Sequence, residues 1–272
     1  MLTQYKSHSL HKHLRDGWSV FNPELQEYVT PVPAQKINGD NWYQGTADAI
    51  YQNEYLIKRS NAEWTIILSG DHIYRMDYAS ILKTHQALNA DATIACMKVP
   101  IELANQFGIV TADAGQKITE FQEKPDITEG CSDDKNFALA SMGIYIFSTK
   151  LLIDILEKDS QDENSSHDFG KDILPSLIDN NKLFAHYFGE SEGRVSPDNY
   201  WRDVGTIDSF YQANMDLLDP VPSMDLYQKD WPIRSYQSQT PPARAVPGSS
   251  GTEGVFINSM LSGGTVISGG NV

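Results

Sequence analysis

The stretch Trp64-Thr-Ile-Ile-Leu-Ser-Gly70-Asp71-His-Ile-Tyr74 gives the strongest indication of the fold. Its first four residues are β-branched or aromatic, and they predict a buried strand. The strand stops at Gly70, where the backbone can turn sharply, and the carboxylate of Asp71 comes next. Ligands bind beyond the carboxyl ends of the strands in open α/β sheets, so Asp71 is placed to hold a cation or polarise a substrate. An equally simple interpretation is that Asp71 caps a helix expected at 78–88.

Strand-like and helix-like runs alternate over about the first 215 residues. This alternation predicts a mostly parallel sheet with helices on both faces, an α/β fold of the Rossmann-like kind. The expected strands are 64–68, 93–99, 108–111, 118–122, 142–147 and 183–188. The expected helices are 46–59, 78–88, 150–158, 169–179 and 207–217.

The last third of the chain changes character. Pro, Ser and Gly concentrate in residues 232–251 and predict a linker. Beyond it, an aliphatic residue recurs every six positions at Val255, Leu261 and Ile267. Hexapeptide periodicity is typical of a parallel β-helix, and three hexads make about one coil. The alternative is a flexible Gly- and Ser-rich tail. We predict a catalytic domain at 1–219, a linker at 220–251 and a first, incomplete coil at 252–272.

Composition limits the class of protein. The chain has 272 residues, 40% of them hydrophobic, which is enough for a substantial core. Its 21 Lys and Arg residues face 36 Asp and Glu, a net charge of −15, which argues against nucleic acid or an anionic membrane as a partner. Two cysteines are too few for a disulfide framework, and no apolar run reaches the ~18 residues of a membrane span. We therefore expect a cytoplasmic protein.

Two further motifs carry chemistry. Glu123-Lys124-Pro125 ends an expected strand, and it offers a lysine for a phosphate and a carboxylate for sugar hydroxyls. The simpler interpretation is an exposed charged pair. Tyr200-Trp-Arg202-Asp203-Val-Gly-Thr206 repeats the pattern of the opening stretch, with Thr206 as the expected cap of the last helix. If Asp203 converges with Asp71, the two carboxylates make a Mg²⁺ site; otherwise Asp203 pairs with a base such as Arg202.

One expected feature of nucleotide-binding proteins does not occur in the sequence. There is no G-x-G-x-x-G and no P-loop in the 272 residues. A protein that handles a nucleoside triphosphate ordinarily has a backbone cradle for its phosphates.

Taken together and in order, the motifs resemble the glucose-1-phosphate adenylyltransferase (ADP-glucose pyrophosphorylase) family of bacterial glycogen synthesis. The resemblance covers nearly the whole chain, including a passage near Trp231 that is similar to the family's entry into a left-handed β-helix. The runs that carry it are Leu2–Tyr5, Trp42–Ala49, Ser69–Tyr74, Glu123–Pro125, Ala140–Tyr145, Ser165–Asp172 and Tyr200–Thr206.

The resemblance implies transfer of AMP from ATP to α-D-glucose 1-phosphate, which gives ADP-glucose and pyrophosphate. It implies Mg²⁺ held by Asp71 and Asp203, with Lys124 gripping the phosphate of glucose 1-phosphate, and it makes these three the catalytic residues. It also implies allosteric small-molecule effectors and a homotetramer. The other implied residues are Tyr43, Gly108, Glu123, Ser141 and Asp168 for the sugar, Gln35 for the nucleotide and Arg59 for the inhibitor AMP.

The sequence also departs from the family pattern. Family members have a first strand and a Gly-rich triphosphate loop before the Leu-Thr-Gln-Tyr run, which here starts at residue 2. We therefore expect a fold without that strand and loop, truncated at both ends and inactive alone. Two alternatives stay open: a non-catalytic sugar-phosphate-binding or regulatory module, and a transferase that uses UTP or dTTP.

Overall fold

The computed structural model describes residues 1–25, 27–35, 42–189, 199–235 and 238–272. They form two compact units. The larger unit holds residues 2–5 and 32–203, and the smaller unit holds residues 1, 6–31 and 204–272. Among the residues described, no helix combines the length and the apolar character that crossing a bilayer requires.

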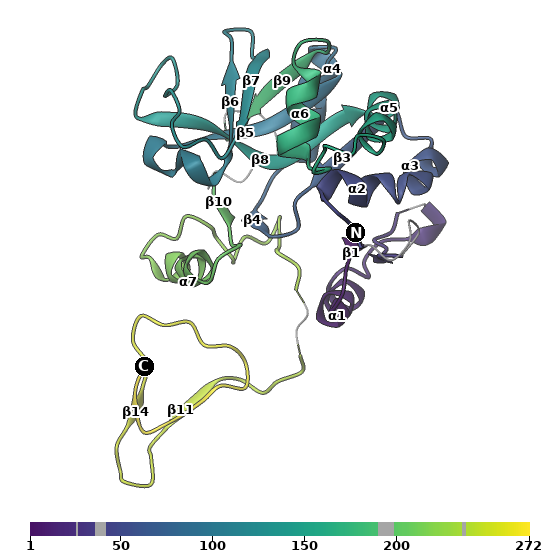
Figure 1. Ribbon diagram of the computed structural model, residues 1–272. Helices are drawn as coiled ribbons and strands as arrows, with labels where there is room; N and C mark the ends of the chain where they lie inside the picture. The colour runs from purple at the N-terminus through teal and green to yellow at the C-terminus, as the bar shows by residue number, and fades with distance from the viewer. Residues whose placement is uncertain (26, 36–41, 190–198, 236–237) are drawn as a thin grey trace. The chain divides into compact units, whose positions relative to one another are not determined.

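A six-stranded sheet forms the centre of the larger unit (Figure 1). The strand order is β7-β6-β8-β5-β9, and β3 also pairs with β8. The predicted strands are all present, with small changes at their ends except in β8, which begins five residues before the predicted strand. Their bounds are β3 Trp64–Leu68, β5 Ala92–Pro100, β6 Gly108–Ala112, β7 Ile118–Glu123, β8 Phe137–Ser148 and β9 Leu183–Tyr187.

The sheet is mixed, and the prediction of a mostly parallel sheet was wrong. β5 and β9 pair in parallel, whereas β8 runs antiparallel to β3, β5 and β6, and β6 runs antiparallel to β7. Parallel neighbours need a crossover connection, usually a helix, and no α-helix separates β6, β7 and β8 along the chain. Because β3 and β5 are both antiparallel to β8, they point the same way.

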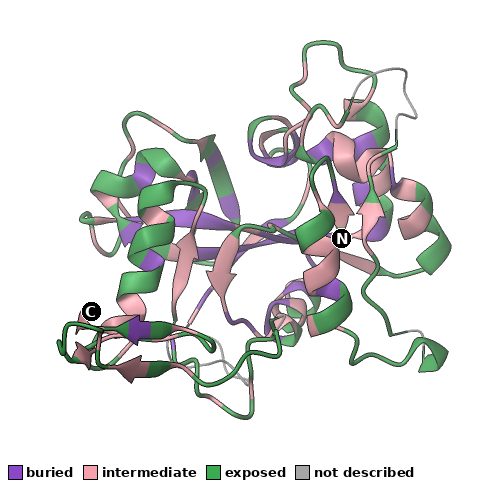
Figure 2. Ribbon diagram, turned by 90° about the horizontal axis from the view of Figure 1, so that it is seen from below, coloured by how far each residue is buried: buried purple, intermediate pink, exposed green. Residues whose placement is uncertain are grey.

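Alternate residues of β8 divide the core between the two faces of the sheet. Tyr145 and Phe147 pack in one cluster with residues of α5 and α6, while Ile144 and Ile146 pack in the other with Ile81 of α4. Side chains of a strand point to opposite faces in turn, so one strand serves two apolar layers. The purple strands in Figure 2 show this burial. The expectation of helices on both faces is confirmed, and the fold is Rossmann-like α/β.

Helices of the larger unit follow the predicted segments but break where the pattern changes. The predicted helix 46–59 is two helices, α2 and α3, that meet at the buried Asn53. The predicted helix 169–179 begins as a single π-helical turn, η3, before α6. The bounds are α2 Thr46–Tyr51, α3 Glu54–Ser60, α4 Tyr78–Ala87, α5 Thr149–Asp159, η3 Phe169–Ile173 and α6 Leu174–Leu177, with a 3-10 segment η2 at Ile101–Gln106.

Two pairs of short strands outside the main sheet were not predicted. β4 (His72–Tyr74) follows β3 after a three-residue turn, and it pairs antiparallel with β10 (Trp201–Asp203). A second small pair, β1 (Leu2–Thr3) and β2 (Val32–Pro33), is parallel. Strands of two or three residues are too short to show a period in the sequence.

The smaller unit contains α1 (His8–Gly17), η1 (Pro23–Leu25), α7 (Ile207–Met215) and η4 (Asp216–Leu218). Thr206 caps α7 as predicted, in a capping box with Ser209. The tail forms two parallel pairs, β11 (Arg244–Val246) with β13 (Val266–Ser268) and β12 (Gly254–Val255) with β14 (Gly270–Asn271).

Candidate active site

The β4–β10 ribbon brings the two predicted metal ligands together. Asp71 lies in the turn before β4, and Asp203 is the last residue of β10, directly opposite His72 in the strand register. Asp71, His72 and Asp203 can each offer a ligand atom, and these atoms lie within 4.8 Å of one another. The predicted convergence of Asp71 and Asp203 is therefore present.

The alternative that Asp71 caps the following helix is wrong. The cap of α4 is Asp77, whose Oδ1 accepts a hydrogen bond from the backbone N–H of Ala79 at 3.0 Å. The Asp71 side chain is 65% exposed, and it faces Nε2 of His72 at 3.5 Å from its Oδ1. Asp71 is thus an exposed carboxylate just beyond the end of β3, where a ligand can reach it.

The glycine that shapes this turn is Gly143 on β8 rather than Gly70. Gly70 has open space around its Cβ position and no left-handed φ. Gly143 has φ +66°, and a Cβ there would clash with Oγ of Ser69 and lie 3.1 Å from Cε1 of His72. The backbone N–H of Ser69 also donates a hydrogen bond to the carbonyl of Gly143 at 3.2 Å. The sequence predicts the turn at Gly70, but it does not show that Gly143 of β8 lies opposite this turn.

The Glu123-Lys124-Pro125 motif sits at the end of β7. Lys124 is exposed and has φ +48°, and its N–H donates to the carbonyl of Phe107 at 3.0 Å. Glu123 is half-buried, so the simple interpretation of an exposed charged pair does not describe it. Burial raises the pKa of Glu123, and the charge of Asp168 raises it further, whereas Lys124 and Lys171 act in the opposite direction. Two lysines therefore act on this carboxylate.

Two glycines line the Glu123 carboxylate. Gly108 is the register partner of Glu123, and a Cβ on Gly108 would lie 3.0 Å from Oε2 of Glu123. A Cβ on Gly170 would lie 2.5 Å from the same oxygen. Gly108 was predicted at this site, and Gly170 was not, although it lies in the motif run 165–172. Side chains at either position would displace the carboxylate.

Asp168 has a structural task beside its predicted contact with sugar. Its Oδ1 accepts hydrogen bonds from the backbone N–H groups of Gly170 and Lys171, at 2.9 and 3.1 Å, and so caps the η3 turn. Its Oδ2 accepts from Oγ1 of Thr46 at 3.0 Å. Thr46, which sequence reasoning did not assign, in turn accepts from the N–H of Phe169 at 3.1 Å. These bonds join two of the motif runs, 42–49 and 165–172.

Ser141 lies buried on β8, and its Oγ accepts from the N–H of Gly143 at 3.3 Å. The nearby phenol of Tyr145, which sequence reasoning missed, has its pKa raised by burial; Ser141 lowers that pKa, while Glu123 and Asp168 raise it. Ser141, Glu123 and Asp168 thus all lie close enough to the Tyr145 phenol to affect its pKa.

The remaining predicted residues lie as follows. The hydroxyl of Tyr43 accepts from Nδ2 of Asn53 at 2.9 Å, so Tyr43 is fixed to the junction of α2 and α3. Gln35 is exposed two residues after β2, and Arg59 is exposed on α3. Their assigned roles toward sugar, nucleotide and AMP stay predictions.

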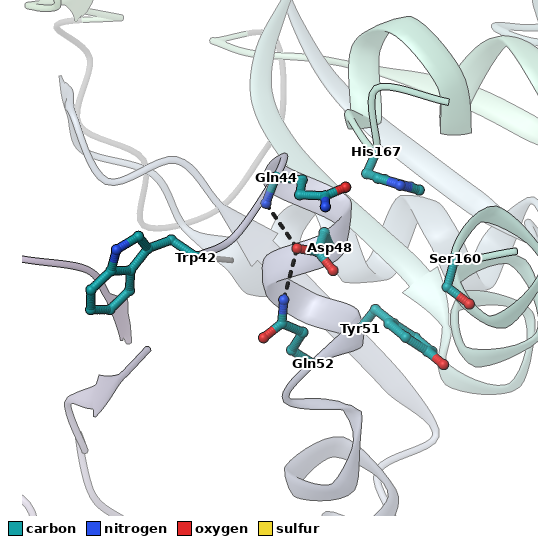
Figure 3. A pocket seen from close by; sticks show the side chains of 7 residues that line it. All are labelled: Trp42, Gln44, Asp48, Tyr51, Gln52, Ser160 and His167. Atoms are coloured by element: carbon teal, nitrogen blue, oxygen red, sulfur yellow. Dashed lines mark hydrogen bonds between the residues drawn. The ribbon is translucent and has the colours of Figure 1, made fainter. Parts of the chain in front are cut away.

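A small polar cavity of about 120 Å³ lies beside the run 42–49 (Figure 3). Asp48 accepts from the N–H of Gln44 and from Nε2 of Gln52, at 2.8 and 2.9 Å, and holds the start of α2. None of the residues predicted to bind substrate or metal lines this cavity. The lining is Trp42, Gln44, Asp48, Tyr51, Gln52, Ser160 and His167.

Comparison with known proteins shows the family of the chain. Residues 1–220 match the family described as nucleotidyl transferase. The chain is 58% identical over all 272 residues to glucose-1-phosphate adenylyltransferase 2 of Vibrio vulnificus (strain YJ016), and it spans 67% of that protein. It is 56% identical, over the same share, to glucose-1-phosphate adenylyltransferase 2 of Vibrio cholerae. The chain belongs to the glucose-1-phosphate adenylyltransferase family.

Membership of the glucose-1-phosphate adenylyltransferase family confirms the resemblance that the motifs indicated. The nucleotidyl transferase match covers residues 1–220, although the sequence contains no P-loop.

Proposed function

We propose that this protein transfers AMP from ATP to α-D-glucose 1-phosphate and releases pyrophosphate. The convergence of Asp71 and Asp203 in a chain of this family is the observation that carries the proposal. Two carboxylates with one exposed side suit Mg²⁺, which takes few protein ligands and keeps water and phosphate oxygens. When bound, Mg²⁺ would neutralise and orient the phosphates.

The reaction exchanges one phosphate bond for another. A phosphate oxygen of glucose 1-phosphate attacks the α-phosphorus of ATP, and the bond from that phosphorus to its bridging oxygen breaks. Pyrophosphate leaves with the electron pair, and ADP-glucose remains. Catalysis of such transfers consists mainly of positioning and charge neutralisation.

The chain's own residues supply the sugar-phosphate side. We infer that the exposed Lys124 binds the phosphate and that the half-buried Glu123 accepts hydrogen bonds from sugar hydroxyls. Gly108 leaves room for the Glu123 carboxylate in this group. Asp168 keeps acceptor capacity, because a carboxylate has about four lone-pair sites and three are used in the contacts above. Ser141 completes this group.

Further assignments rest on the family alone. Tyr43 toward the sugar, Gln35 toward the nucleotide and Arg59 toward AMP remain proposals, as do effectors, a homotetramer and a cytoplasmic location. For the tail, we propose the first coil of a left-handed β-helix at 252–272, after a catalytic domain at 1–219 and a linker at 220–251. Two parallel pairs support a β-helix, since successive passes of a β-helix pair in parallel. One of these strands, β11 (Arg244–Val246), lies within the proposed linker, so parallel pairing starts before residue 252.

A chimera tests the function directly. The 272 residues replace the matching segment of the Vibrio vulnificus relative, and products are identified after incubation with glucose 1-phosphate, Mg²⁺ and ATP, UTP or dTTP. The proposal predicts ADP-glucose and pyrophosphate with ATP. Preference for UTP or dTTP would support the transferase alternative. Glucose 1-phosphate binding without turnover by the folded chimera would support the non-catalytic module.

A further inference from the structure

His72 is held within the proposed metal site rather than beside it. It directly follows Asp71, and it is the register partner of Asp203 across the β4–β10 ribbon. Directly opposed residues of an antiparallel pair have their side chains on the same face. The imidazole is only 12% exposed, whereas Asp71 is 65% exposed.

The hydrogen bond of Nδ1 defines what Nε2 can do. Nδ1 of His72 lies 3.0 Å from the carbonyl oxygen of Met142, which can only accept. In the neutral ring Nδ1 therefore carries the proton, and Nε2 presents its lone pair. Nε2 faces Asp71, 3.5 Å from Oδ1. Histidines that bind metals nearly always donate their other N–H to a carbonyl or carboxylate in this way.

The ring is fixed in this orientation from two further sides. The edge-on contact with Trp201 of β10 has a centroid distance of 5.0 Å, and Trp201 is itself packed edge-on against Phe107 at 5.3 Å. Gly143 leaves just enough room for the ring, because a Cβ there would lie 3.1 Å from Cε1. Nε2 thus points toward the aspartates without needing a rotamer change.

We propose that Nε2 of His72 is the third protein ligand of the Asp71–Asp203 metal site, and that it sets which divalent cations the site prefers. This rests on the proposed function. Ligand atoms around an ion with bonds of about 2.1 Å lie roughly 3 to 4.2 Å apart. Nε2 of His72 and Oδ1 of Asp71, 3.5 Å apart, already lie within that range, and all three ligand atoms lie within 4.8 Å of one another. A nitrogen ligand favours Co²⁺ or Zn²⁺ over Mg²⁺, which prefers oxygen.

The test measures metal binding by the 272-residue chain, without turnover. Co²⁺ and Mg²⁺ affinities are determined by titration for the wild type, His72→Gln, Asp71→Asn and the control His8→Gln on α1. Proton NMR of the Co²⁺ form in water detects the exchangeable Nδ1–H of a metal-bound imidazole as a strongly shifted resonance.

We expect that shifted resonance in the wild type and in His8→Gln, and its loss in His72→Gln. Co²⁺ affinity of His72→Gln should fall at least about tenfold, some 1.4 kcal/mol, while Mg²⁺ affinity changes by less than about threefold. A resonance retained in His72→Gln, equal losses for both metals, or no change for either would overturn the inference. If Asp71→Asn leaves both affinities unchanged, the proposed metal site is wrong. If Asp71→Asn weakens metal binding but His72→Gln does not, His72 is excluded as a ligand and the site stands.

Discussion

At the scale of single residues, the sequence shows which side chains are present but not which of them meet in the fold. Asp71 and Asp203 are far apart in the sequence, so spacing alone left their meeting open, and only the unpredicted β4–β10 ribbon joins them. Glu123 and Gly108 were predicted together, and they are register partners. Gly143 and Gly170 were missed because a glycine's task depends on the atoms facing it, and these come from distant segments.

Glu123→Gln should stabilise the ligand-free protein at neutral pH while weakening glucose 1-phosphate binding. Its pKa is raised in the folded state, so the ionised form is disfavoured there. The destabilisation is absent below the unfolded pKa of about 4.3, grows as the pH rises through the folded pKa, and is complete above it. The Tm difference between the variant and the wild type should follow that course.

The matched control is Glu120→Gln, an exposed glutamate of the same strand. Binding by Glu123→Gln should weaken about tenfold or more, as when a charged hydrogen bond is lost. A lower Tm for Glu123→Gln at pH 7, or unchanged glucose 1-phosphate affinity, would refute this account of Glu123.

Gly143→Ala should destabilise the protein by about 2 kcal/mol or more. Its φ of +66° disfavours any side chain, and the new methyl group would meet Ser69 and His72. Denaturant unfolding measures the change, with Gly70→Ala as the control because nothing lies within 4 Å of its Cβ position. Similar losses for both variants would contradict the assignment of the turn to Gly143.

At the scale of elements, strongly patterned segments were predictable and their pairing was not. β3 has the predicted bounds, since five apolar or β-branched residues mark it. The prediction that it is buried was wrong, because Ile66 and Leu68 are exposed. The first half of β8 was missed because Ala138 and Ala140 have no strand preference in the sequence, although both are buried. The antiparallel position of β8 follows from connections without helices, which the sequence shows only as unassigned loops.

The cap of α4 gives a test at this scale. Asp77→Ala should cost about 1 kcal/mol of stability, because its carboxylate accepts from the N–H of Ala79. Asp71→Ala, on the strand-end side of the same segment, should cost much less. Thermal unfolding of the two variants decides, and a larger loss for Asp71→Ala would restore Asp71 as a structural cap.

At the scale of the whole molecule, the chain is acidic, but lysines gather near Glu123. The net charge is −15, yet Lys124 and Lys171 both act on Glu123. Local lysines and a divalent cation can thus offset a polyphosphate without a basic surface.

We propose that Asp71 and Asp203 act as one metal site for nucleotidyl transfer. The most direct measurement is kcat for ADP-glucose formation by the chimera carrying Asp71→Asn, Asp203→Asn or both, with the exposed Asp179→Asn as control. We predict that each single change costs about a thousandfold, roughly 4 kcal/mol, and that the double variant is no worse than the poorer single one. A double variant in which the two single losses of kcat multiply would contradict it. So would a normal kcat in either single variant with the fold intact.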